Sequence, residues 1–223
     1  MAAFSYAGSS LMFLIVCLTL AFLSPCHSDP DPLQDFCVAD LDSKVLVNGF
    51  TCKPASTVTA QDFFFTGLAK QANTSANPFG ANVTSANVLS FPGLNTLGLS
   101  MNRVDYAPGG LNIPHSHPRA TELVLVLQGR LFVGFVSTGN LLFSKVVRPG
   151  EIFVIPKGLV HFQYNVGKGK ALAITVFNSQ QPGAVLLSPT LFGSKPTIPG
   201  EILAKAFQID EQLVNDIKSK FGA

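Results

Sequence analysis

Charged side chains are scarce in this sequence. Asp, Glu, Lys and Arg make up 13% of the 223 residues, and 47% of the residues are hydrophobic. Soluble domains usually carry roughly 25% charged residues, so this composition excludes a disordered or linker-like chain. The formal net charge is +2, and the basic residues do not cluster beyond the short Lys168–Lys170 pair. Nothing therefore favours a nucleic-acid partner, and the length suits one large domain.

Several common catalytic motifs are also absent. The sequence contains no G-x-x-x-x-G-K-[ST], no C-x-x-C and no G-x-S-x-G. It therefore offers no phosphate-binding P-loop, no redox dithiol and no nucleophile elbow. No internal repeat with a period of about 20–50 residues is visible either, which argues against a solenoid.

The first 28 residues contain no charged side chain. Leu11 to Leu23 is apolar apart from one threonine, and it is shorter than the roughly 20 apolar residues of a membrane span. Small and turn-forming residues follow up to Ser28. This layout predicts a secretory signal peptide over residues 1–28 and a mature domain over residues 29–223, with no membrane association. An uncleaved signal anchor is the alternative.

The few cysteines agree with secretion. Of the four, Cys17 and Cys26 would leave with the signal peptide, so Cys37 and Cys52 remain. In an oxidising compartment such a pair indicates a disulfide bond; two buried free thiols are the alternative.

Two N-glycosylation sequons point the same way. They are Asn73-Thr74-Ser75 and Asn82-Val83-Thr84, and both lie in the polar stretch 71–86. This stretch is expected to be a surface loop, which would expose at least one sequon to glycosylation.

From residue 88 onward, short runs of β-branched and aromatic residues alternate with Gly, Pro and Asn. The pattern predicts an all-β sandwich or barrel, with strands at Thr96–Tyr106, Glu122–Leu127, Leu131–Ser137, Leu141–Val147, Ile152–Ile155, His161–Val166 and Ala171–Asn178. The C-terminal tail differs, because its apolar residues follow helical spacing. We expect a helix around Ile202–Phe207 and a second one that begins after an N-cap at Asp210.

Histidine is the most informative residue type. The mature chain has three: His115 and His117, two positions apart, and His161. On a strand, that i, i+2 spacing turns both imidazoles to one face. Glu122 opens the next predicted strand, and His161 begins another. Three imidazoles and one carboxylate suit a divalent transition metal and leave coordination positions open for a substrate. An unrelated scatter of histidines is the alternative.

The spacing around these residues resembles both histidine motifs of the cupin superfamily. The first motif runs from Gly109 through the histidine pair to Gly129, and the second runs from Gly150 to Asn165. Longer segments resemble plant germins and germin-like proteins, namely DPDPLQDFCVADL, NGFTCK, SMNRVDYAPGG, PHSHPRATEL, PKGLVHFQYNVG and FNSQQPG.

The resemblance implies a cupin jelly-roll β-barrel with a C-terminal α-helical hairpin. It also implies manganese held by His115, His117, Glu122 and His161, a Cys37–Cys52 disulfide, a hexamer built as a trimer of dimers, and an extracellular location in the apoplast or cell wall. The residues alone do not select manganese, because imidazole also suits Zn, Cu, Fe and Ni.

The resemblance leaves three functions open. Superoxide dismutation, with a role in defence or the cell wall, is favoured. Oxalate oxidation is the second, because Asn102 and Asn112 match the asparagines that position oxalate in germins. The neighbours Leu111, Ile113 and Ser116 depart from the residues that oxalate-oxidising germins tend to carry. The third is non-enzymatic binding of a small, auxin-like ligand, as in receptor-type members.

Overall fold

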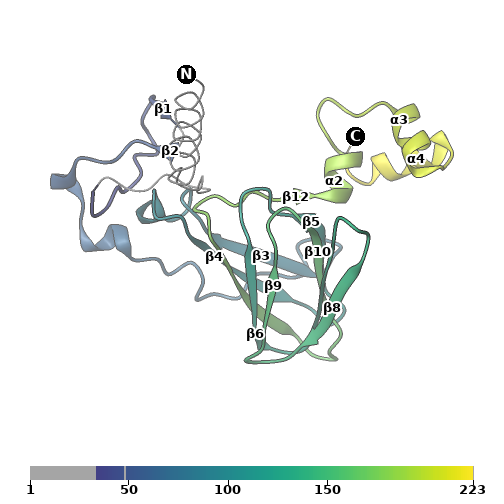
Figure 1. Ribbon diagram of the computed structural model, residues 1–223, viewed down its shortest axis with the longest axis horizontal. Helices are drawn as coiled ribbons and strands as arrows, with labels where there is room; N and C mark the ends of the chain where they lie inside the picture. Colours follow the sequence, from purple (N-terminus) through teal and green to yellow (C-terminus); the bar gives the residue numbers. More distant parts are fainter. Residues whose placement is uncertain (1–33, 48, 223) are drawn as a thin grey trace, which may run out of the picture.

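A computed structural model of the protein describes residues 34–47 and 49–222 (Figure 1). The expected signal peptide, residues 1–28, lies outside the described residues. No helix in the described part is long and apolar enough to cross a membrane.

Two five-stranded antiparallel sheets form the body of the protein, which confirms the predicted all-β cupin barrel. The first sheet has the order β12-β5-β10-β7-β8 and comprises Val185–Leu186, Leu111–Ser116, Val160–Asn165, Leu131–Val136 and Leu142–Val147. The second has the order β3-β4-β11-β6-β9 and comprises Ala81–Ala86, Ser100–Tyr106, Ala171–Phe177, Glu122–Gln128 and Ile152–Ile155. Strands that are distant in the sequence are therefore neighbours in space.

The inward faces of the two sheets form the main core. Alternation along the strands places every second side chain inside, as on β11, where Ala171, Ala173 and Phe177 are buried. The fully buried core also includes Val124, Val126, Leu131, Val133 and Tyr106. This apolar packing fixes the strand register from which the polar end of the barrel is built.

An N-terminal segment packs beside the barrel. It contains the small hairpin of β1 (Leu46–Val47) and β2 (Gly49–Phe50), and short 3-10 helices at Ala55–Thr57, Ala60–Phe63 and Pro92–Leu94. Cys37 and Cys52 are joined by a disulfide bond.

Three helices follow the barrel, namely α2 (Leu187–Phe192), α3 (Gly200–Phe207) and α4 (Glu211–Ser219), and they share a small core of Phe192, Leu203 and Val214. The first, α2, contacts β5 and β12, while α3 and α4 stand away from the barrel (Figure 1). The two predicted C-terminal helices are thus confirmed, with Asp210 at the N-cap position of α4. Helix α2 was not predicted, because a six-residue helix shows too little periodicity.

Among the described strands, the sequence analysis missed the six-residue strands β3 and β5 and the two-residue strands β1, β2 and β12. The stretch 71–86 was expected to be a loop, but its last six residues form β3, which pairs with β4 along its whole length. The residues of β3 are mostly polar and give no strand signal of their own. The strand forms by pairing with β4, which lies almost twenty residues further along the chain. Strand β5 was also not assigned, although it carries the first predicted histidine. The strand predicted from Thr96 begins only at Ser100.

Candidate metal centre

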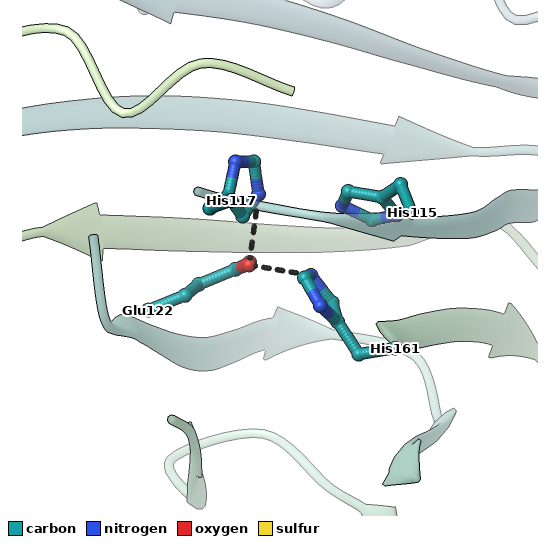
Figure 2. A group of neighbouring side chains, drawn as sticks. All are labelled: His115, His117, Glu122 and His161. Atoms are coloured by element: carbon teal, nitrogen blue, oxygen red, sulfur yellow. Dashed lines mark ion pairs between the residues drawn. The ribbon is translucent and has the colours of Figure 1, made fainter. Parts of the chain in front are cut away.

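The four predicted ligands come together in one cluster (Figure 2). His115 lies near the end of β5 and His117 just after it, while Glu122 begins β6 in the opposite sheet. His161, on β10, is directly paired with His115 in the strand register. All four side chains are buried, none more than 6% exposed. Both sheets therefore contribute to the cluster, which the sequence order alone does not reveal.

The ligand atoms converge on a small volume. One nitrogen or oxygen from each of the four residues lies within 4.8 Å of every other. The Glu122 Oε2 atom lies 3.2 Å from His117 Nε2 and 2.9 Å from His161 Nε2. The His115 and His161 rings are 4.1 Å apart between centroids. These separations suit four atoms arranged around one ion.

Backbone carbonyls fix the orientation of all three imidazole rings. Nδ1 lies 2.7 Å from the Ile113 carbonyl oxygen in His115 and 2.9 Å from that of Leu159 in His161. In His117 it lies 2.5 Å from the carbonyl oxygen of Gly183. A carbonyl oxygen only accepts hydrogen bonds, so each Nδ1 must carry a proton. In the neutral ring, Nε2 then presents its lone pair to the centre of the cluster.

The protonation of the cluster is set by burial and by its own members. Burial, and next the neighbouring His161, lower the pKa of His115 to about 4. Burial raises the pKa of Glu122, but its close contacts with the His117 and His161 rings outweigh that effect and bring it to about 2. At neutral pH the cluster therefore has an ionised carboxylate and a neutral His115.

This donor set fits a metal ion. Glu122 Oε2 and His161 Nε2 are both buried and have no hydrogen-bond partner within the described chain, although they are only 2.9 Å apart. Two acceptors at that distance repel each other unless a cation lies between them. Three imidazole nitrogens and one carboxylate oxygen are ligands that divalent transition metals prefer.

A cavity of about 350 Å³ opens onto the cluster. His115, His117 and Glu122 line it, and so do both predicted positioning residues, Asn102 and Asn112. No Lys or Arg occurs among the described residues of its lining. An anion that enters the cavity would therefore meet no positively charged Lys or Arg side chain there, and only a cation held by the cluster could offset its charge.

Gln163 is a site residue that the sequence analysis missed. It is fully buried on β10. Its Nε2 donates to Glu122 Oε1 at 3.4 Å, and its Oε1 accepts from Asn112 Nδ2 at 2.7 Å. Gln163 thus links the carboxylate of the cluster to an amide that lines the cavity. The available signal was its i+2 spacing from His161, which places both side chains on the same face of a strand.

Comparisons with known proteins agree with this architecture. A family model described as "Cupin" matches residues 66–215. Germin-like protein subfamily T member 2 of Arabidopsis thaliana is 60% identical over 216 residues, covering 96% of this chain and 97% of that protein. The chain belongs to the germin-like branch of the cupin family. Germin-like protein 1-1 of Oryza sativa subsp. japonica is 57% identical over 205 residues, covering 92% of this chain and 94% of the relative.

A solved structure gives the same result for the fold. The structure titled "Oxalate oxidase in complex with substrate analogue glycolate" is 56% identical, with a TM-score of 0.84, and covers 86% of this chain and 98% of that one. This germin-like chain therefore shares both its barrel and a high sequence identity with an oxalate-oxidising enzyme.

Proposed function

We propose that this protein is a secreted, manganese-dependent germin-like protein that dismutates superoxide and releases hydrogen peroxide. The observation that carries the proposal is the convergence of four acceptor atoms on a buried point that a cavity reaches from outside. Four protein ligands leave positions open for a small reactant, as in catalytic rather than closed structural sites. Manganese is proposed over other transition metals from the germin resemblance.

The chain's own groups support reaction with a small anion. His115, His117, His161 and Glu122 would hold the ion, which supplies redox chemistry by changing its oxidation state. The single carboxylate does not fully neutralise a divalent ion, so the centre keeps positive charge that attracts superoxide. The backbone carbonyls that accept from each Nδ1 keep Nε2 directed inward. Gln163 holds the second oxygen of Glu122 away from the centre.

Oxalate oxidation is the second candidate. It is favoured by the 56% identity to an oxalate oxidase and by the position of Asn102 and Asn112 in the cavity wall. Oxalate is a dianion with four oxygen atoms, so it needs donors in addition to the metal. However, one N–H of Asn112 is already directed at Gln163. That contact reduces the donors available to a substrate.

The location and assembly are part of the same proposal. Germin-like relatives and the expected signal peptide support secretion to the apoplast or cell wall. The hexamer is proposed from the germin resemblance, and contact with another subunit is supported by exposed apolar residues of the projecting helices, among them Ile202, Phe207 and Leu213, which are 53%, 46% and 46% exposed. A partner subunit would cover these side chains.

One experiment separates the two activities. The assays measure metal content, superoxide loss and oxalate-dependent peroxide in the secreted wild type and in Asn102→Leu and Asn112→Leu. His161→Ala is the control that is expected to lack metal. Superoxide reacts at the metal with little positioning, so its rate should stay within a few-fold of wild type in both Asn variants. Any oxalate oxidation should fall about tenfold or more, because a hydrogen bond to a charged group contributes roughly 1.5–3 kcal/mol.

The outcomes point to different functions. Strong oxalate-dependent peroxide production by the wild type, lost in either Asn variant, would make oxalate oxidation the principal activity. A wild-type protein that carries metal but shows neither activity would contradict both enzymatic functions and favour ligand binding. Full manganese occupancy in His161→Ala would contradict the four-ligand centre.

A further inference from the structure

A row of polar side chains crosses the inner face of the second sheet beside the metal centre. The strand register pairs Ser85 on β3 with Asn102 on β4, and Asn102 with Thr175 on β11. All three residues line the cavity that reaches the cluster. The next row inward consists of Val83, Val104 and Ala173, so the polar row ends where the apolar core begins.

Thr175 is the unexpected member of this row. The other inward-facing residues of β11 are Ala171, Ala173 and Phe177, all buried and apolar. Thr175 is 2% exposed, and its Oγ1 atom has no hydrogen-bond partner in the described chain. A buried hydroxyl without a partner destabilises the folded protein. Thr175 lines the cavity, and a hydroxyl there that lowers the stability of the folded protein is what a ligand-binding role predicts.

The position of Thr175 relative to Glu122 sets the size of the ligand. Thr175 pairs with Val124 on β6, and Glu122 lies two residues before Val124. Such diagonal neighbours on one face of an antiparallel pair are roughly 7–8 Å apart. A gap therefore remains between the ion that Glu122 holds and the hydroxyl of Thr175. This gap has room for an anion of a few heavy atoms. The described lining of the cavity contains no Lys or Arg. The metal ion would therefore be the only full positive charge that this lining offers to the anion.

We propose that Thr175 is a specificity-determining residue that, with Ser85 and Asn102, holds the outer oxygen atoms of a small carboxylate bound at the metal centre. The inference rests on the metal centre of the proposed function and adds a ligand class to it. Hydroxyl and amide groups donate hydrogen bonds to carboxylate oxygens, while the metal supplies the opposite charge. A carboxylate held there shares the metal with superoxide and inhibits its dismutation competitively.

The test measures oxalate binding to the manganese-loaded, secreted protein without oxygen, so that no turnover occurs. Thr175→Val removes the hydroxyl with little change in shape, and Thr175→Ser retains it as the matched control. Thr175→Val should weaken oxalate binding about tenfold or more, the factor for one lost hydrogen bond to a charged group. Thr175→Ser should stay within about threefold of wild type. Fluoride, which contacts the metal but cannot span to Thr175, should bind all three proteins equally.

Thermal unfolding supplies a readout that a purely structural threonine would not give. Because the unliganded hydroxyl has no partner, Thr175→Val should unfold at the same temperature as wild type or higher, while its oxalate affinity falls. Unchanged oxalate affinity in metal-loaded Thr175→Val would overturn the inference. Failure of the metal-loaded wild type to bind oxalate would overturn it too. Neither result would contradict the metal centre itself. Wild-type protein without any bound transition metal would overturn the proposed function and the inference together.

Discussion

Replacing Gln163 with leucine tests whether the amide behind Glu122 stabilises metal binding. Gln163 is fully buried, and its Nε2 donates to Glu122 Oε1. Leucine has a similar size but no donor, so Glu122 would keep its charge and lose this hydrogen bond. The Asn112 amide would lose its acceptor at the same time. We therefore expect Gln163→Leu to weaken metal binding and to lower the free energy of unfolding.

The geometry sets the expected magnitude. Groups that hydrogen-bond to metal ligands typically contribute about 10- to 100-fold to metal affinity. The Gln163–Glu122 contact is 3.4 Å long, near the outer limit of a hydrogen bond, so we expect a loss at the lower end, about tenfold. The free energy of unfolding should fall by about 1–3 kcal/mol, because the half-buried Asn112 amide and the buried Glu122 carboxylate each lose a partner.

Competition with a chelator measures the metal affinity, and urea unfolding measures the stability. The control is Gln212→Leu, which changes an exposed glutamine on α4 that contacts Asp216. This control should retain wild-type metal affinity. A double variant with Asn112→Leu should lose less than the sum of the two single changes, since both alter one network. Manganese retention equal to wild type in Gln163→Leu would refute the argument.

Two further predictions concern the core and the helices. The phenolic oxygen of Tyr106 is buried without a partner in the described chain, so Tyr106→Phe should raise the free energy of unfolding by about 1 kcal/mol at pH 7 in urea unfolding. Burial, and next the Glu122 carboxylate, raise the pKa of Tyr106 in the folded protein well above its ordinary 10.0. Above pH 10 the unfolded chain therefore binds fewer protons than the folded chain. The stability of the wild type should then fall more steeply with pH than the stability of Tyr106→Phe. Equal slopes would count against this account. Truncation after Gly200 should lower the oligomer mass in light scattering, because it removes the exposed apolar residues of α3 and α4; an unchanged mass in a folded, truncated protein would assign those helices to their own subunit.

The sequence alone determined the elements whose signals are local. The i, i+2 spacing of His115 and His117 and the Gly and Pro residues between strands indicated the barrel and its candidate ligands. Helical spacing and Asp210 placed the last two helices correctly. The sequence could determine these features because period, capping and turn chemistry act over a few neighbouring residues.

Only the tertiary structure decided which distant residues face each other. Strand β3 is polar and was predicted to be a loop, yet its pairing with β4 brings Ser85 beside Asn102. The roles of Gln163 and Thr175 depend on register between strands far apart in the chain. A shift of one residue would turn each side chain to the opposite face. That register is set by packing of the whole barrel core, which no local sequence pattern specifies.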